Sequence, residues 1–73
     1  MKDELLVKFG NAIKEKRNQI GISQEELAHL ANLDRTYIGG VERGERNISL
    51  INLIKVSHAL NIPLSKILKD INE

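Results

Sequence analysis

Side chains that form directed hydrogen bonds gather in the middle of this chain. They lie in two short groups: Arg35-Thr36-Tyr37, and then Arg43, Arg46 and Asn47. An arginine carries a planar fork of N–H donors that fits a phosphate, or the O6 and N7 acceptors of a guanine, with two hydrogen bonds. Hydroxyl and amide groups add single hydrogen bonds. These residue types at this spacing have the chemistry to bind an anionic, acceptor-rich partner.

Two helix-start signals would position the first of these groups. Ser23 and Glu26 form a Ser-x-x-Glu pattern, a reciprocal capping box, and Asp34 is well suited to cap a second helix. The spacing predicts helices over 24–31 and 35–42, joined by a tight turn. A short helix that presents polar side chains from its exposed first turn is how a helix-turn-helix contacts base edges in the major groove of DNA.

Residues 24–43 resemble the helix-turn-helix of the Cro/cI-type (XRE-type) DNA-binding domains, and the wider likeness covers about residues 8–68. The small controller proteins of restriction–modification systems are similar over the run LDRTYIGGVER at 33–43, and again at Arg46-Asn47. One position departs from the family pattern, because the turn residue that is usually glycine is Asn32 here. Asparagine tolerates a left-handed backbone better than most other residues, so the turn is still expected.

Apolar residues recur at helical spacing on both sides of this unit and predict further helices. Gly21 supplies a stop for the first helix, Ser49 a cap for the fourth, and Pro63 fits the first turn of the fifth. No window alternates enough to be a strand, so the expected fold is all-α. The resemblance implies the compact five-helix arrangement of a Cro/cI repressor-like domain. The expected helices cover about 3–19, 24–31, 35–42, 50–60 and the last apolar stripe from 63 onward.

Length and composition indicate one small domain, residues 1–73. A domain of this size buries only roughly 60% of its unfolded surface and is marginally stable alone. The chain has no cysteine for a disulfide or a thiolate metal site, so a dimer interface is the remaining way to bury more surface. The start has no apolar signal region, and no apolar run approaches the ~20 residues of a membrane span. We therefore expect a cytoplasmic protein without a membrane partner.

The net charge of +1 is low for a DNA-binding protein. Nucleic-acid-binding domains commonly have a pI above about 9. The distribution of charge resolves the difficulty if Asp34 is turned inward as a cap and Glu42 is paired. Arginines 35, 43 and 46 would then dominate the binding surface. Charge alone would not identify a DNA-binding protein, whereas the motif does.

The exposed first turn and the resemblance together assign roles to the polar residues. We expect Arg35, Thr36 and Arg46 to contact bases. Contacts to the DNA backbone are expected from Gln24, Tyr37, Arg43 and Asn47. An ordinary solvated side chain is the alternative for each, and Tyr37 could equally lie over the edge of the domain. Gly40 stands where members of the family often have a base-contacting side chain, so recognition should concentrate on the first turn and the loop.

Two acid–base features have structural or surface roles in this interpretation. In the family that the chain resembles, an arginine late in the first helix pairs with a glutamate late in the recognition helix, and Arg17 and Glu42 match those positions. His29 and His58 lie on different expected helices with no carboxylate at metal-ligand spacing. No glycine-rich phosphate loop or paired nucleophile and base is evident. We expect no enzyme activity, metal, cofactor or small-molecule ligand.

The last apolar stripe suggests how two copies would meet. Leu64, Ile67, Leu68 and Ile71 repeat at helical spacing. We expect Ile67 and Ile71 to lie on a face shared with a two-fold partner, together with part of the fourth helix. Leu64 and Leu68 should then turn into the domain core.

These features together predict a homodimeric, sequence-specific transcriptional regulator that binds double-stranded DNA. Its palindromic operator would have half-sites about one helical turn apart, ~34–36 Å. The controller-type resemblance implies control of a restriction–modification operon. Three alternatives stay open at this point: a phage-type repressor, a toxin–antitoxin regulator of the same fold, and a helix-turn-helix module that has lost DNA binding and serves as a protein adaptor.

Overall fold

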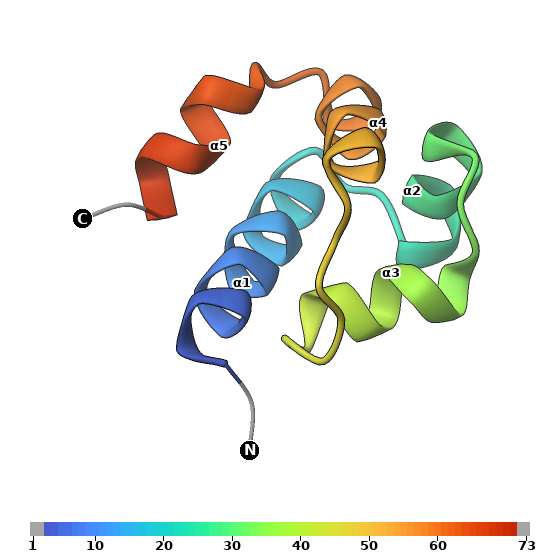
Figure 1. Ribbon diagram of the computed structural model, residues 1–73. Coiled ribbons are helices and arrows are strands. Elements are labelled where there is room, and N and C mark those ends of the chain that lie inside the picture. The colour runs from blue at the N-terminus through green and yellow to red at the C-terminus, as the bar shows by residue number, and fades with distance from the viewer. Residues whose placement is uncertain (1–2, 72–73) are drawn as a thin grey trace.

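The computed structural model describes residues 3–71, and this part of the chain folds as five α-helices joined by short loops (Figure 1). The helices are α1 (Glu4–Gln19), α2 (Gln24–Ala31), α3 (Arg35–Glu42), α4 (Leu50–Leu60) and α5 (Leu64–Ile71). No strand occurs within residues 3–71, so the predicted all-α fold of five helices is confirmed. None of these helices combines the length and the apolar composition that crossing a membrane requires.

Side-chain caps fix where the helices of the central motif begin. The Ser23 hydroxyl accepts a hydrogen bond from the Glu26 backbone N–H at 3.0 Å, and the Glu26 carboxylate accepts one from the Ser23 N–H at 2.8 Å. Asp34 accepts from the Thr36 N–H at 2.9 Å and so starts α3. Ser49 caps α4 in the same way. These bonds satisfy N–H groups that have no partner within a helix, and they set the start of each helix.

The turn between α2 and α3 depends on Asn32. Its φ of 56° and ψ of 46° lie in the left-handed region, which asparagine tolerates better than most residues. The next residue, Leu33, donates its backbone N–H to the carbonyl of Ala28 at 2.8 Å and closes the turn. The departure from glycine is therefore accommodated without a change in the motif.

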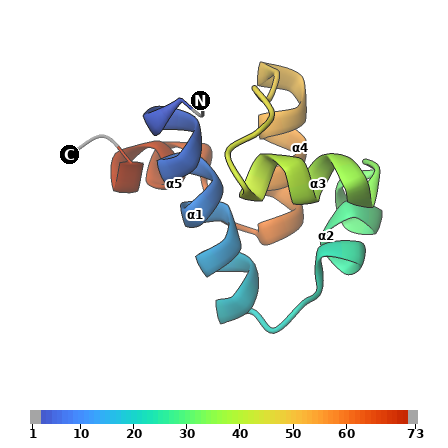
Figure 2. The same ribbon diagram turned by 90° about the horizontal axis from the view of Figure 1, so that it is seen from below.

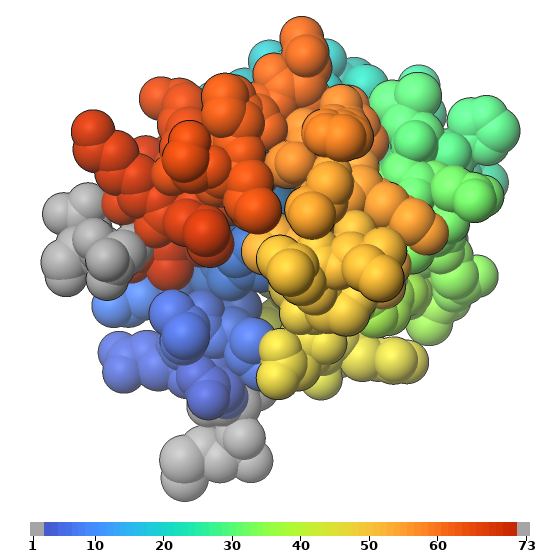
Figure 3. All heavy atoms as spheres, turned by 45° about the horizontal axis from the view of Figure 1, so that its top comes forward, coloured from blue at the N-terminus to red at the C-terminus, as the bar shows by residue number. Residues whose placement is uncertain are grey.

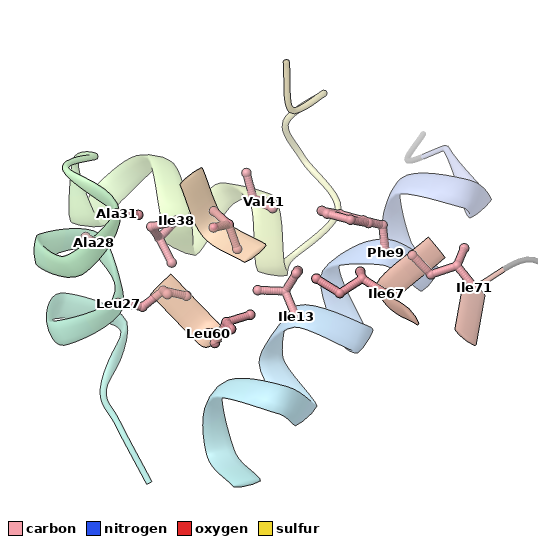
Figure 4. Close-up of a cluster of buried hydrophobic side chains, with 11 residues drawn as sticks. Phe9, Ile13, Leu27, Ala28, Ala31, Ile38, Val41, Leu60, Ile67 and Ile71 are labelled. Carbon is pink, nitrogen blue, oxygen red and sulfur yellow. The ribbon is translucent and has the colours of Figure 1, made fainter. Parts of the chain in front are cut away.

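α1 and α2 together hold α3 in place. α3 packs against both α1 and α2, and Figure 2 shows it lying between them. α2 also packs against α4, while α5 covers α1 and contacts α4. The side chains converge on one core, drawn in Figure 4. The buried core residues are Phe9, Ile13, Leu27, Ala28, Ala31, Ile38, Val41, Val56, Leu60, Ile67 and Ile71.

α1 and α3 approach most closely at Gly10. A Cβ added there would meet the backbone carbonyl oxygen of Val41 and would lie 2.5 Å from that of Glu42. Backbone atoms cannot rotate out of the way as a side chain can. Gly10 is therefore required for the two helices to pack at this distance.

The structure corrects the prediction for α5. Ile67 is fully buried and Ile71 is only 9% exposed, and Figure 4 shows both among the core residues with Phe9 and Ile13. Leu68 is 45% exposed instead of lying in the core, and Leu64 is half-buried. Ile67 and Ile71 fill the contact of α5 with α1 and cannot also form a surface shared with a second copy. The helical period identified the stripe, but not the side of it that faces inward.

Candidate DNA-binding surface

α3 separates a buried side from an exposed, polar first turn. Ile38 and Val41 are buried in the core, whereas Arg35 and Thr36 are exposed. The helix lies along the lower right edge of the molecule in Figure 1. This arrangement holds the helix through its apolar side and leaves its first turn to contact a partner, which is how a recognition helix contacts a groove.

Tyr37 connects the first turn of α3 to two other segments. Its hydroxyl accepts a hydrogen bond from Asn52 Nδ2 of α4 at 3.2 Å. The guanidinium carbon of Arg46, from the loop after α3, lies 5.8 Å from the centroid of the tyrosine ring. That distance is within the range of a cation–π contact. The loop arginine is thereby brought back to Tyr37 in the first turn of the helix.

The expected backbone-contacting residues have different local partners. Arg43 and Asn47 are exposed in the loop, and Arg43 Nε lies 3.0 Å from the Glu45 carboxylate. Gln24 is half-buried, and its Nε2 donates a hydrogen bond to Glu42 Oε1 at 2.9 Å. Gln24 therefore also supports α3, a role that the sequence did not reveal.

Arg17 and Glu42 form an ion pair between α1 and the last turn of α3. Arg17 Nε and Nη2 donate to Glu42 Oε2 and Oε1 at 2.6 and 3.0 Å, and the two side chains are 10% and 2% exposed. Arg17 Nη1 also donates to the Ile22 carbonyl at 2.9 Å. The hydrogen bond to Glu42 raises the pKa of Arg17 above its ordinary value, against the effect of burial. A paired, fully hydrogen-bonded geometry of this kind is what offsets the desolvation of two charges.

Burial of Glu42 also shapes the charge of the surface beside α3. Its carboxylate is covered and neutralised by Arg17, so it does not face the solvent there. The Asp34 side chain caps the start of α3 as expected, but it is exposed and not turned inward. The exposed arginines of α3 and its loop are Arg35, Arg43 and Arg46. A chain whose net charge is only +1 can in this way present cations on the surface beside α3.

Two residues that help to position this surface were missed in the sequence. Asn52 looked like an ordinary residue in the first turn of α4, and its contact with Tyr37 joins residues 15 positions apart. Gly10 gave no signal beyond its residue type.

The two histidines, His29 and His58, are both exposed, on α2 and α4. Over residues 3–71, no three His, Asp or Glu side chains come together in a way that could hold a metal ion.

Comparison with known proteins gives a consistent result. The helix-turn-helix family model matches residues 13–67. The control protein C.MunI of a Mycoplasma species is 42% identical over 72 residues, which are 97% of each protein. The crystal structure of the restriction–modification controller protein C.AhdI from Aeromonas hydrophila superposes with a TM-score of 0.84 and 53% identity, over 85% of this chain and 94% of that one. Wild-type C.Esp1396I, another restriction–modification controller protein, superposes with a TM-score of 0.84 and 36% identity over 96% of both chains.

Proposed function

The chain belongs to the helix-turn-helix family and is a DNA-binding transcriptional regulator, and we propose that it acts as a homodimeric controller of a restriction–modification operon. The observation that carries the proposal is the exposed first turn of α3, which presents Arg35 and Thr36 and whose Tyr37 is contacted by an arginine of the following loop. Its action is regulatory and not enzymatic. The same proposal puts the protein in the cytoplasm with its DNA.

Base recognition is assigned to the first turn of α3 and to the loop that follows it. Arg35 is exposed and has the fork geometry for two hydrogen bonds to one guanine. Thr36 offers a hydroxyl and a methyl group, which suit a base edge or a thymine methyl. Arg46 extends this set from the loop. Each well-formed bidentate contact contributes about 1–3 kcal/mol of discrimination between bases.

Backbone contacts are assigned to residues that keep a donor for phosphate oxygen. The Tyr37 hydroxyl accepts from Asn52, which leaves its own hydrogen to donate. Gln24 Nε2 has two hydrogens and uses one of them on Glu42. Arg43 and Asn47 are exposed in the loop and complete the set. Contacts of this type fix the position of the protein on the duplex, without specifying its sequence.

Dimerisation is assigned to an apolar surface on α4 and α5. We call it the α4–α5 patch. Its members are Leu50, Ile51 and Ile54 of α4, which are 66%, 69% and 39% exposed, and Leu68 of α5, which is 45% exposed. α4 and α5 lie side by side on the face shown in Figure 3. Exposed apolar side chains on two neighbouring helices of so small a domain favour a protein interface. A two-fold contact there would give both copies the same buried surface.

Footprinting of the protein on the promoter of its own gene tests the proposal. We expect one or more protected regions with two-fold symmetry, whose half-sites lie about one helical turn apart, and binding that weakens as salt rises. Binding that shows neither salt sensitivity nor sequence selectivity would favour the protein-adaptor alternative. Flanking genes for a restriction endonuclease and a methyltransferase would separate a controller from a phage-type repressor or a toxin–antitoxin regulator.

A further inference from the structure

Gly39 and Gly40 are adjacent in the interior of α3, where glycine destabilises a helix relative to alanine. Neither has the positive φ that would require glycine, because among the described glycines only Gly21 and Gly44 do. Both are nevertheless buried. The two positions therefore call for an explanation based on the space that a side chain would take.

The atoms above the two glycines are of different kinds. A Cβ added at Gly40 would lie 2.8 Å from Cγ of Arg46, and 3.6 and 3.7 Å from its Nε and Cδ. Because Cγ is close to the backbone, rotating the guanidinium would not relieve the overlap, and the whole side chain would have to leave. A Cβ at Gly39 would lie 3.0 Å from Nη1 of Arg43. That atom is the end of a flexible, exposed side chain and can move at little cost.

The Arg46 side chain occupies the space above Gly40. From its position in the loop, the side chain crosses α3 directly over Gly40 and ends 5.8 Å from the centre of the Tyr37 ring. The ring is held in turn by Asn52 of α4. The guanidinium thus reaches the polar first turn of α3 from outside the helix. It covers the helix surface from which a larger residue at position 40 would project its own side chain.

We propose that Gly40 is a positioning residue for DNA recognition. Its missing side chain lets Arg46 cross α3 and stack on Tyr37, so that the loop arginine contacts a base in place of a side chain from position 40. Holding a long side chain in one conformation before binding lowers the entropy cost of ordering it on the DNA. The inference rests on the base contact that the proposed function assigns to Arg46.

Gly40→Ala and Gly39→Ala are matched variants that test the inference, because both replace a helical glycine with a better helix former. We expect both to be folded and to melt no lower than the wild type. Gly40→Ala should bind the promoter fragment protected in the footprint roughly tenfold more weakly, the scale of one lost base contact. Binding of Gly40→Ala to random-sequence DNA should change much less. Gly39→Ala should bind both the promoter fragment and random-sequence DNA nearly as the wild type does. Equal operator affinity for the two variants overturns the inference.

A measurement without DNA examines the positioning step itself. Tyr37 is the only tyrosine in a chain that has no tryptophan, so a ring-current shift of the Arg46 protons can be assigned to its ring. In the wild type and Gly39→Ala, NMR should show the side-chain protons of Arg46 shifted by the ring, and in Gly40→Ala that shift should be lost. A shift that persists in Gly40→Ala overturns the inference, as does a lost shift with unchanged operator affinity.

A double-mutant cycle links the two residues. In an Arg46→Ala background, adding Gly40→Ala should cause no further loss of operator affinity, because the side chain that needs the space is gone. Independent, additive losses would overturn the inference while leaving the proposed function intact. Failure of the proposed function has a different signature, because the wild type itself would then show no sequence-selective binding.

Discussion

α3 and α5 both pack against α1, and consecutive residues of α1 tie them down in different ways. Arg17 makes two hydrogen bonds to Glu42 of α3, and both side chains are almost fully buried. Lys16 makes one 2.7 Å contact with Asp70 of α5, and that carboxylate is 42% exposed. The recognition helix is held by charges removed from water, while α5 is held mainly by the apolar contacts of its inner face. A single buried ion pair therefore matters more for the orientation of α3 than any polar contact does for the orientation of α5.

The outer surfaces of the two regions differ as well. α3 presents arginine and threonine from its first turn, whereas α4 and α5 present the leucine and isoleucine side chains of the α4–α5 patch. A polar surface suits a hydrated, charged partner such as DNA, and an apolar one suits a second protein surface. The proposed function accordingly assigns DNA binding and assembly to separate parts of a very small domain.

Glu42→Ala should produce the largest loss of stability, because it removes the buried ion pair that distinguishes α3 from α5. It leaves the buried Arg17 without its carboxylate, and breaking a buried pair in this way costs about 3–5 kcal/mol. That is a large part of the stability of a small domain, roughly 5–15 kcal/mol. Thermal and urea unfolding measure the loss. Glu45→Ala, which removes the exposed partner of Arg43, is the control and should cost much less. Equal melting of the two variants would mean that the buried pair does not hold α3.

Ile51→Asp tests whether the α4–α5 patch carries self-association. Ile51 is 69% exposed, so the variant should fold, but a charge in the α4–α5 patch should weaken self-association by at least ~2 kcal/mol. Sedimentation would show a shift to monomer and gel shifts a weaker operator complex. Leu30→Asp is the matched control, because Leu30 is 59% exposed on α2, outside the patch. A dimer that survives Ile51→Asp and dissociates in the control would move the interface to α2.

Arg35→Ala asks whether the polar surface specifies sequence. We expect operator binding to weaken by about 1–3 kcal/mol, with a much smaller change on random DNA. Arg43→Ala should instead weaken both and lower the magnitude of the salt dependence by roughly one unit. Binding isotherms at several salt concentrations on the two DNAs distinguish these results. Parallel losses for Arg35→Ala on both DNAs would make it a backbone contact.

Asp70→Asn should have the smallest effect, because the carboxylate is largely in water. The hydrogen bond from Lys16 holds the pKa of Asp70 below its ordinary value of 3.8. A lowered pKa in the folded state means that the stabilisation is present above the ordinary value and is lost as pH falls through the lowered one. The small difference in melting temperature between wild type and variant should therefore be seen at neutral pH and disappear in acid. A loss of stability as large as that of Glu42→Ala would mean that the two ion pairs contribute equally.

Local signals made the central motif predictable. The Ser23–Glu26 capping box, the Asp34 cap and the tolerance of Asn32 for a left-handed backbone each act within a few residues of sequence. The orientation of α5 was not predictable in this way. Ile67 and Leu68 are neighbours in one apolar stripe, and the way α5 lies on α1 decides which of them is buried. The loop path that brings Arg46 to Tyr37 likewise depends on tertiary packing and has no local signal.

The close contact at Gly10 has a consequence for how this protein could acquire new targets. The last turn of α3 lies against the backbone of α1, so substitutions that shift it would disturb the packing of both helices. The first turn and the following loop carry no such constraint at Arg35, Thr36 and Arg46, whose side chains are exposed and to which the proposed function assigns base contacts. Under the proposed function, operator preference can therefore diverge by changes at one end of a single helix and in one loop, while the scaffold stays the same. A library randomised only at these three positions should yield folded variants with altered operators.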